Sequence, residues 1–474
     1  MTTQLAYLTA HEALSLMRAK ELSPVELLDA VLTRADAMNP SINAFADTYF
    51  EQAFVQAKAS ENRYVQGEAL PLDGLPLAVK DAQRVAGKRT THGSLIFMNH
   101  IDDHSDPMIE RLQAAGAIIH ARTTTPEFCL SGMCHSKAWG VTRNPFNLGM
   151  TPGGSSGGSG AALAAGATLL ATGTDIGGSV RIPASACGVV GYKPPHGRNP
   201  DGPPNNFDLY NHPGPMTRSV RDAALMQNVV SGPHPLDHWS LRDLVRIPDT
   251  FAPLKGMKIA CSINLGFMEV EPEVEARTRE ALEFFKSLGC IVEEVAVPWD
   301  KSVEDAAVHW YCSMHYGRQT IWHAKDNDRL LTPYARAFAR FAEKHTTLDD
   351  MAKSWEKIHE MQAFFGPLME NYDLFICPTN SVPAVRADHN PADPKFFVNG
   401  KQVDPENGWI MTYPFNMLHF NPAMSVPSGR ASNGVPTGIQ LVGRTFDDLT
   451  VFRAGMAYED AAPHLFINAE NHPM

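Results

Sequence analysis

The stretch from Thr151 to Gly197 constrains this chain more than any other. It opens with the glycine and serine run GGSSGGSG at 153–160, which has little side chain to bury and allows unusual backbone angles. A small apolar run at 161–171 follows, and it is typical of a helix or another buried element packed close to its neighbours. A second glycine turn, GTDIGGS, then ends on the hydroxyl of Ser179. The main chain therefore shapes this region more than the side chains do.

Glycines that precede a serine are useful in acyl transfer. Without side chains in the way, consecutive backbone N–H groups can converge on one point and stabilise the oxyanion of a tetrahedral intermediate. The candidate donors here are the N–H groups of Ile176, Gly177, Gly178 and Ser179. This pattern predicts an oxyanion hole around the Ser179 hydroxyl.

A serine hydroxyl is a weak nucleophile until a base takes its proton. None of the 19 histidines lies in this stretch before His196, so the usual base is missing. The other candidate is Lys80, which ends the segment GLPLAVK at 74–80. Leu75, Leu77 and Val79 alternate there with small or constrained residues, which predicts a short buried strand. Burial disfavours the charged form of a lysine, whose pKa in water is about 10.4, so this amine could act as a base.

These residues resemble the amidase signature hydrolases, among them bacterial amidases, hydrazidases and cyclic nylon-oligomer hydrolases. The similarity covers the glycine and serine stretch, the strand that ends in Lys80-Asp81, the approach at 144–146 and the C-terminal segment PTGIQLVG at 436–443. In that family a serine, a second serine held by a cis peptide bond and a lysine form the catalytic triad. The resemblance implies that Ser179 is the nucleophile, Ser155 the cis serine and Lys80 the base. It implies no metal and no organic cofactor.

The resemblance also suggests roles for residues around the triad. Asp175 and Arg181 flank the nucleophile and are expected to hold its loop through buried hydrogen bonds. The remaining candidates are expected to line or support the substrate pocket, with structural support favoured for the glutamate: Ser131, Tyr311, Cys312, Thr125 and Glu127.

Two other kinds of site are disfavoured by the sequence. The run GGSSGGSG superficially resembles a nucleotide-binding loop, but no Gly-Lys-Ser/Thr follows and no acidic residue stands at the dinucleotide spacing. Cys129, Cys134 and His135 could suggest a metal, yet the 7 cysteines are scattered without a CxxC pair. Buried reduced thiols are the preferred interpretation, and they predict a cytoplasmic protein.

The fold expected for the 474 residues is α/β, in a single large domain with a central mixed, twisted sheet covered by helices on both faces. Within it we expect an N-terminal helical cap at 1–65, a catalytic core at 66–230 and a helical substrate-pocket insertion at 300–370. In the cap, Ser23 and Pro24 predict the start of a helix that ends at Asn39-Pro40.

The function expected from the resemblance is amidase activity on a small carboxamide, or on a related acyl hydrazide or carbamate, through an acyl-enzyme. The alternative is the glutaminase component of a tRNA-dependent amidotransferase, which supplies ammonia to a partner. A formal net charge of −12 argues against nucleic acid or an anionic membrane as the main partner. The expected partner is a small amide-type substrate, and a homodimer is left open. The sequence does not specify the acyl group or the leaving amine.

Overall fold

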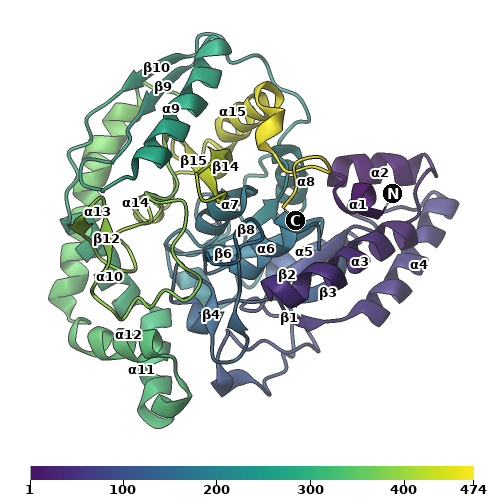
Figure 1. The fold of residues 1–474 in the computed structure, drawn as a ribbon, viewed down its shortest axis with the longest axis horizontal. Coiled ribbons are helices and arrows are strands. Elements are labelled where there is room, and N and C mark those ends of the chain that lie inside the picture. The colour runs from purple at the N-terminus through teal and green to yellow at the C-terminus, as the bar shows by residue number, and fades with distance from the viewer. Residues whose placement is uncertain (1, 474) are drawn as a thin grey trace.

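A computed structural model describes residues 2–473, and eleven strands of this part of the chain form one mixed sheet (Figure 1). Across the sheet the order is β1-β3-β2-β6-β8-β7-β14-β15-β11-β9-β10. β2 runs parallel to β3 and β6, and β9 runs parallel to β11 and β10. Between β6 and β11, the ladders that join β6, β8, β7, β14, β15 and β11 are antiparallel. The strands are β1 Phe45–Thr48, β2 Pro76–Lys80, β3 Ile118–Thr123, β6 Leu170–Asp175, β7 Val190–Lys193, β8 His212–Thr217, β9 Lys258–Cys261, β10 Ile291–Glu294, β11 Leu374–Pro378, β14 Ala423–Arg430 and β15 Pro436–Gly443. Two small separate hairpins comprise β4 His135–Ser136 with β5 Gly140–Val141, and β12 Phe397–Val398 with β13 Lys401–Gln402.

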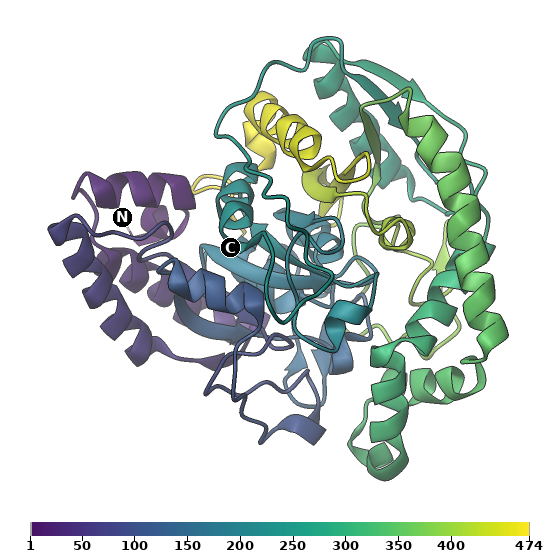
Figure 2. The same ribbon diagram turned by 180° about the vertical axis from the view of Figure 1, so that it is seen from behind.

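Helices pack on the sheet and beyond both of its ends (Figures 1 and 2). They are α1 Thr2–Ala6, α2 Ala10–Arg18, α3 Pro24–Ile42, α4 Phe50–Gln66, α5 Pro107–Ala114, α6 Gly157–Ala164, α7 Arg181–Cys187, α8 Val220–Val230, α9 Pro272–Ser287, α10 Ser302–Ser313, α11 His315–Asn327, α12 Pro333–Lys344, α13 Leu348–Met369, α14 Pro414–Met417 and α15 Asp448–Ala461. The short 3₁₀ helices are η1 Leu95–Phe97, η2 Glu127–Cys129, η3 Asn205–Phe207, η4 Asp328–Leu330 and η5 Pro463–Leu465. This architecture confirms the predicted α/β fold with a mixed central sheet.

Alternating side chains in β11 show why both faces of the sheet are covered. Leu374 and Ile376 pack into a core that includes residues of α8, α9 and α15. Phe375 and Cys377 pack into another core that includes residues of α10, α13 and α14. All four side chains are fully buried, so each face of the strand needs its own layer of helices.

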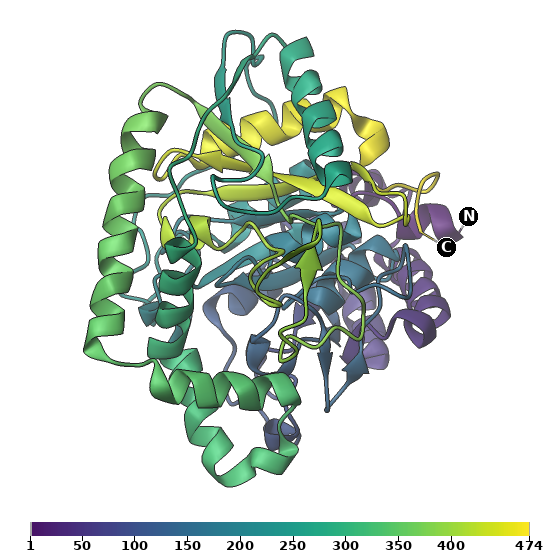
Figure 3. The same cartoon turned by 60° about the vertical axis from the view of Figure 1, so that its left-hand side comes forward.

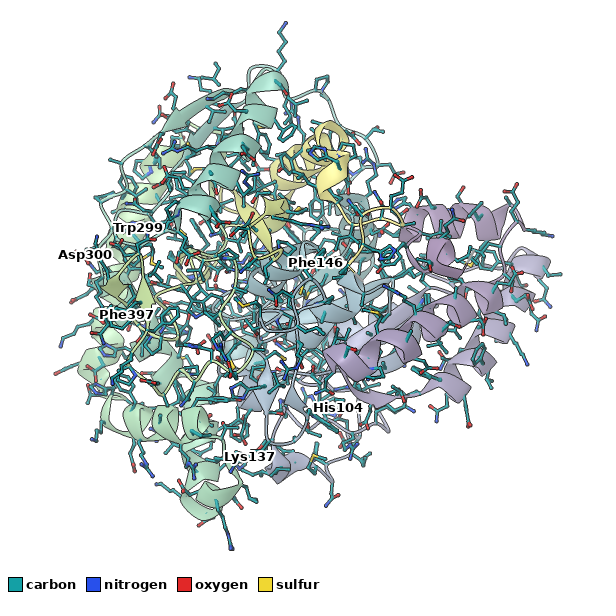
Figure 4. The ribbon with its side chains drawn as sticks, viewed as in Figure 1. His104, Lys137, Phe146, Trp299, Asp300 and Phe397 are labelled. Atoms are coloured by element: carbon teal, nitrogen blue, oxygen red, sulfur yellow. The ribbon has the colours of Figure 1, made fainter. Side chains whose placement is uncertain are left out.

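The helices α10 to α13 form one long flank of the molecule, which Figure 3 shows in green beside the sheet. This flank carries the aromatic residues of the 300–370 segment, and Trp310 is among the largest buried side chains of the protein. Lys137, labelled near the lower edge of Figure 4, donates a hydrogen bond of 2.9 Å to the carbonyl of Arg329. The flank is thereby tied to the loop that leads to the serine-rich stretch.

Two predicted boundaries were wrong. The helix that begins after Ser23 continues through Pro40 to Ile42, because the left-handed residue that ends it is Asn43, with φ of 51°. Pro40 lies in the last turn, where its missing N–H removes the helical hydrogen bond to the Asp36 carbonyl, and the helix ends two residues later. The apolar run at 161–171 is not one element, since α6 ends at Ala164 and β6 begins at Leu170.

Candidate active site

Lys80 is the last residue of β2 and has no exposed surface. Leu77 and Val79 face the core that contains α2, α5 and α8, whereas Ala78 packs against α6. Successive side chains of a strand alternate between faces, so Lys80 lies on the same face as Ala78 and α6. The alternation expected from the sequence thus places the amine beneath the serine-rich loop.

The Lys80 amine contacts two hydroxyl groups. Its Nζ lies 2.7 Å from Ser155 Oγ and 2.8 Å from Thr174 Oγ1. Burial lowers the pKa of Lys80, although Cys129, Cys134 and Asp175 act in the opposite direction. A buried amine whose charged form is disfavoured can hold a lone pair for a proton.

Ser155 lies in the loop that leads into α6. The Gly154–Ser155 peptide bond is cis, as the resemblance implied for this serine. Ser155 is 1% exposed, so the contact between its hydroxyl and Lys80 is shielded from solvent. The next residue, Ser156, donates from its N–H to the carbonyl of Ser179 at 3.2 Å, which joins the serine loop to the glycine turn.

In the glycine turn after β6, the backbone at Gly178 has a conformation that only glycine readily adopts. Gly178 has φ of +123°, and a Cβ there would lie 1.8 Å from Thr412 Oγ1. Thr412 also donates from its hydroxyl to the Gly177 carbonyl at 2.5 Å, which fixes the direction of that peptide. Within residues 2–473 no acceptor is paired with the N–H groups of the four predicted donors, Ile176, Gly177, Gly178 and Ser179. These N–H groups are therefore free to bind a ligand.

Asp175 and Arg181 form a fully buried ion pair across this turn. Arg181 Nε and Nη2 donate to the two carboxylate oxygens at 3.0 and 2.9 Å. Burial alone would raise the pKa of Asp175, but Arg181 and a hydrogen bond from Asn416 outweigh it and lower that pKa. The remaining Arg181 donors reach the Thr412 carbonyl, Gln440 Oε1 and Asn416 Oδ1.

Arg181→Met is expected to lower the free energy of unfolding by about 3–5 kcal/mol, because it leaves the Asp175 carboxylate buried without its cation. Urea unfolding at pH 7.5, followed by tryptophan fluorescence, measures the change. The double variant Asp175→Asn/Arg181→Met removes that charge and should recover part of the loss. A double variant less stable than the single one would contradict this account of the pair.

A cavity of about 400 Å³ opens beside Ser179. Its walls come from the turn at 176–179, from the loop at 128–132, from α10 and α12, and from the segment at 391–410. Apolar and aromatic side chains make up much of the lining: Phe128, Leu130, Ile176, Ile182, Val308, Tyr311, Tyr334, Phe338, Phe341 and Ile410.

The predicted pocket residues take different places. Ser131 and Tyr311 line the cavity. Cys312 lies instead in a small buried cluster with Ile321 and Ala342, because the next residue of a helix turns to another face, and we do not carry it into the pocket. Glu127 is fully buried and accepts hydrogen bonds from Ser94 and from Thr332, the N-cap of α12, in keeping with the supporting role expected for it. Thr125 is also buried and contacts Cys129, whose thiol lines the cavity.

Several site residues were not predicted from the sequence. Glu406 lines the cavity and accepts hydrogen bonds from the Ser131 hydroxyl at 2.7 Å and from the Gly132 N–H. Burial raises the pKa of Glu406 to about 7. Three further residues form hydrogen bonds with predicted parts of the site: Thr174 with Lys80, Thr412 with the glycine turn, and Asn416 with Asp175. Thr174 and Gln440 lay in motifs that the sequence had singled out, GTDIGGS and PTGIQLVG, but no role had been expected for either residue.

Residues 2–473 contain neither a candidate metal cluster nor a candidate membrane span. No group of three or more histidine, cysteine, aspartate or glutamate side chains in this range could hold a metal ion. No helix in the same range is long and apolar enough to cross a membrane.

The mixed sheet holds the serine loop, the glycine turn and the buried lysine close together, and the glycine turn borders the cavity. A family model described as Amidase matches residues 26–452, so the chain belongs to the amidase signature family of hydrolases, which act on carbon–nitrogen bonds.

Individual relatives cover nearly the whole chain. An acylamidase from Rhodococcus erythropolis is 33% identical to it over 98% of this chain and 97% of the relative. A component of the glutamyl-tRNA(Gln) amidotransferase of Geobacter metallireducens is 32% identical over 96% of this chain and 97% of the relative. The crystal structure of a bacterial aryl acylamidase superimposes with a TM-score of 0.90 at 29% identity, and 99% of each chain is covered. The relatives thus share the fold and the family but differ in their named substrates.

Proposed function

We propose that this protein is an amidase that hydrolyses the carbon–nitrogen bond of small carboxamides, with Ser179 as nucleophile, Ser155 as proton relay and Lys80 as base. The observation that carries the proposal is the 2.7 Å contact between the buried Lys80 amine and the Ser155 hydroxyl. A neutral amine has two N–H donors and one lone pair. It can therefore donate to Thr174 and accept from Ser155 at the same time.

The first half of the reaction forms an acyl-enzyme. The Ser179 hydroxyl has no hydrogen-bond partner within residues 2–473, so on substrate binding it must first come within hydrogen-bond distance of Ser155 Oγ. Ser179 Oγ then attacks the carbonyl carbon, its proton passes to Ser155 Oγ, and the Ser155 proton passes to Lys80 Nζ. The N–H groups of the turn, from Ile176, Gly177, Gly178 and Ser179, are the donors that stabilise the oxyanion. When the carbon–nitrogen bond breaks, the proton returns through the same relay to the leaving nitrogen.

The second half of the reaction releases the acid. A water molecule gives its proton to the relay and attacks the ester carbonyl, and Ser179 regains a proton as the carbon–oxygen bond of the ester breaks. Asp175 and Arg181 touch no reacting atom in this scheme. They hold the turn that carries the oxyanion donors, so they are positioning residues.

The cavity favours an apolar or aryl acyl group over glutamine. Its lining carries the acids Asp208, Asp404 and Glu406, and no lysine or arginine of the described residues lines it. The α-ammonium of glutamine can pair with one of these acids, but its α-carboxylate would enter this cavity without a counter-ion, which is unfavourable in a buried site. Similarity to amidotransferase components is what supports the glutaminase alternative.

A substrate panel tests the proposal. Benzamide, hexanamide, benzohydrazide, phenyl carbamate and glutamine would each be incubated with the purified protein, and release of ammonia, hydrazine or phenol would be measured. We expect kcat/KM for benzamide or hexanamide to exceed that for glutamine by about 100-fold, since leaving one carboxylate unpaired costs that much binding. Glutamine as the best substrate, above all in the presence of copurifying partner proteins, would favour the amidotransferase alternative.

A further inference from the structure

The cavity beside Ser179 contains a carboxylate that has no cationic partner. Asp208 follows η3, is 3% exposed and lines this cavity. Its Oδ1 accepts hydrogen bonds from Trp310 Nε1 at 2.8 Å and from the Tyr210 N–H at 3.0 Å. Both donors are neutral and both contact the same oxygen. Among residues 2–473, no donor is paired with Oδ2.

The carboxylate remains largely ionised at neutral pH. Burial raises the pKa of Asp208 to about 6, and the hydrogen bonds from Trp310 and Tyr210 act in the opposite direction. A buried charge is costly unless a cation or several donors accompany it. The free oxygen of Asp208 is therefore suited to a positively charged group of a ligand.

A second unpartnered group lies in the same cavity. The Tyr311 hydroxyl is buried and has no hydrogen-bond partner among the described residues. A Cβ on Gly177 would lie 2.7 Å from this oxygen, so the hydroxyl is next to the proposed oxyanion donors. Burial raises the pKa of Tyr311, and Asp175 and Asp208 raise it further. The hydroxyl thus stays neutral and can accept a hydrogen bond from a ligand.

The other two acids of the cavity differ from Asp208. Both oxygens of Glu406 accept hydrogen bonds from the loop at 131–132. Asp404 Oδ1 accepts from the N–H groups of Glu406 and Asn407 at 2.9 and 2.7 Å, and no donor of the described residues is paired with its Oδ2. Asp404 is only half-buried, however, so water can solvate its free oxygen, whereas Asp208 is buried. No lysine, arginine or histidine in the described part of the chain lines the cavity, so none neutralises Asp208 there.

We propose that Asp208 and Tyr311 form a subsite for an ammonium group of the substrate. The apolar lining suits the body of such a molecule, with Phe128, Val308 and Phe338 among its contacts. The preferred substrates are then small amides whose apolar body carries a basic nitrogen away from the reacting carbonyl. This inference rests on the proposed amidase function, because it names the substrate class of the same site.

A purely structural role for Asp208 would leave a different signature. Trp310 stacks on Tyr210 with ring centroids 4.5 Å apart, and Asp208 holds both residues, so it also helps to join α10 to the core. That role needs only Oδ1, which asparagine retains. The variant Asp208→Asn should therefore keep the packing while it removes the charge.

Matched substrates separate the two roles. The pairs are 4-(aminomethyl)benzamide with 4-ethylbenzamide, and 3-(aminomethyl)benzamide with 3-ethylbenzamide, in which a methyl group replaces the ammonium. Ammonia release gives kcat/KM for the wild type and for the variants Asp208→Asn, Tyr311→Phe and Asp404→Asn. Calorimetry of the same amides with the Ser179→Ala variant measures binding without turnover.

We expect the wild type to prefer the ammonium member of at least one pair by about tenfold, as a charge-assisted hydrogen bond allows. Asp208→Asn should abolish this preference and change kcat/KM for the ethyl compound by less than about threefold. Tyr311→Phe should reduce the preference by about threefold, and Asp404→Asn should leave it within about twofold of the wild type.

Three results would overturn the subsite. The first is a wild type that does not favour the ammonium compound in either pair. The second is an Asp208→Asn variant in which kcat/KM falls equally for both members of a pair. The third is an Asp404→Asn variant that loses as much preference for the ammonium compound as Asp208→Asn does. If none of the four amides is hydrolysed, the proposed amidase function fails instead. The calorimetric preference for the ammonium compound would still test the subsite in that case.

Discussion

Ser179→Ala is expected to abolish amide hydrolysis, with a fall in kcat of roughly 10⁴-fold or more, because no other group at the glycine turn can form the acyl-enzyme. The variant should unfold at the same urea concentration as the wild type, since Ser179 Oγ makes no hydrogen bond within residues 2–473. Ammonia release from benzamide, followed over hours at high enzyme concentration, measures the residual rate. Mass spectrometry after brief incubation with a slow ester substrate should find the acyl group on Ser179 of the wild type only.

Ser156→Ala provides the matched control for this loss. Ser156 lies in the same loop as Ser155, and its buried hydroxyl has no hydrogen-bond partner among the described residues. Its removal should change kcat by less than about threefold. A Ser179→Ala variant that keeps most of its activity, or a Ser156→Ala variant that loses most of its own, would place the nucleophile elsewhere.

The sequence predicts those parts of the site that depend on local patterns. The alternation of Leu75, Leu77 and Val79 determines which face of the strand carries Lys80, and the structure agrees with it. The glycines at 177 and 178 predict main-chain N–H groups available as oxyanion donors, and no acceptor is paired with these N–H groups within residues 2–473. Local residue spacing was sufficient in both cases because each feature is formed within a few residues of chain.

Partners that come from distant parts of the chain could not be predicted in this way. Arg181 meets Gln440 of β15 because α7 packs on β14 and β15, and it meets Thr412 and Asn416 in the segment that precedes β14. The free oxygen of Asp208 is likewise a result of tertiary packing, since it depends on where Trp310 of α10 comes to lie. Neither contact has a periodicity or a motif that a single sequence could reveal.

The two halves of the chain therefore contribute differently to the site. Segments before residue 200 supply the reacting groups and hold them on adjacent strands and loops of one sheet. Segments after residue 300 supply most of the apolar cavity wall and part of the hydrogen-bond network behind the glycine turn. Variation in the later segments can alter the substrate and leave the relay intact, which agrees with relatives that share the family and differ in named activity.

Lys80→Met is expected to lower kcat by about 10³–10⁴-fold, because methionine fills a similar volume and cannot accept the proton from Ser155. Its effect on stability should be small, within about 2 kcal/mol. The variant removes a buried amine whose charged form is disfavoured, but it leaves the Ser155 and Thr174 hydroxyls without that partner. Ammonia release and urea unfolding measure the two effects separately.

Lys193→Met is the matched control, since Lys193 is also fully buried and burial lowers its pKa well below the ordinary value. Its amine donates only to main-chain carbonyls within residues 2–473, those of Pro194 and Asn421, and it does not line the cavity. This variant should keep kcat within about fivefold of the wild type. Comparable losses in both lysine variants would mean that burial of a lysine, and not contact with Ser155, explains the effect.

The pH dependence provides a separate test of the role of Lys80. The base must be neutral, so kcat/KM of the wild type should rise with pH until the lowered pKa of Lys80 is passed and should then level off. Glu406, with a pKa of about 7, and Asp208, with a pKa of about 6, also titrate in the cavity. In the pH profile of the residual activity of Lys80→Met, the rise of kcat/KM that is due to Lys80 should be absent. Any change of kcat/KM with pH that is due to these two acids should persist. An unchanged profile in that variant would show that the proton of Ser155 goes to another base.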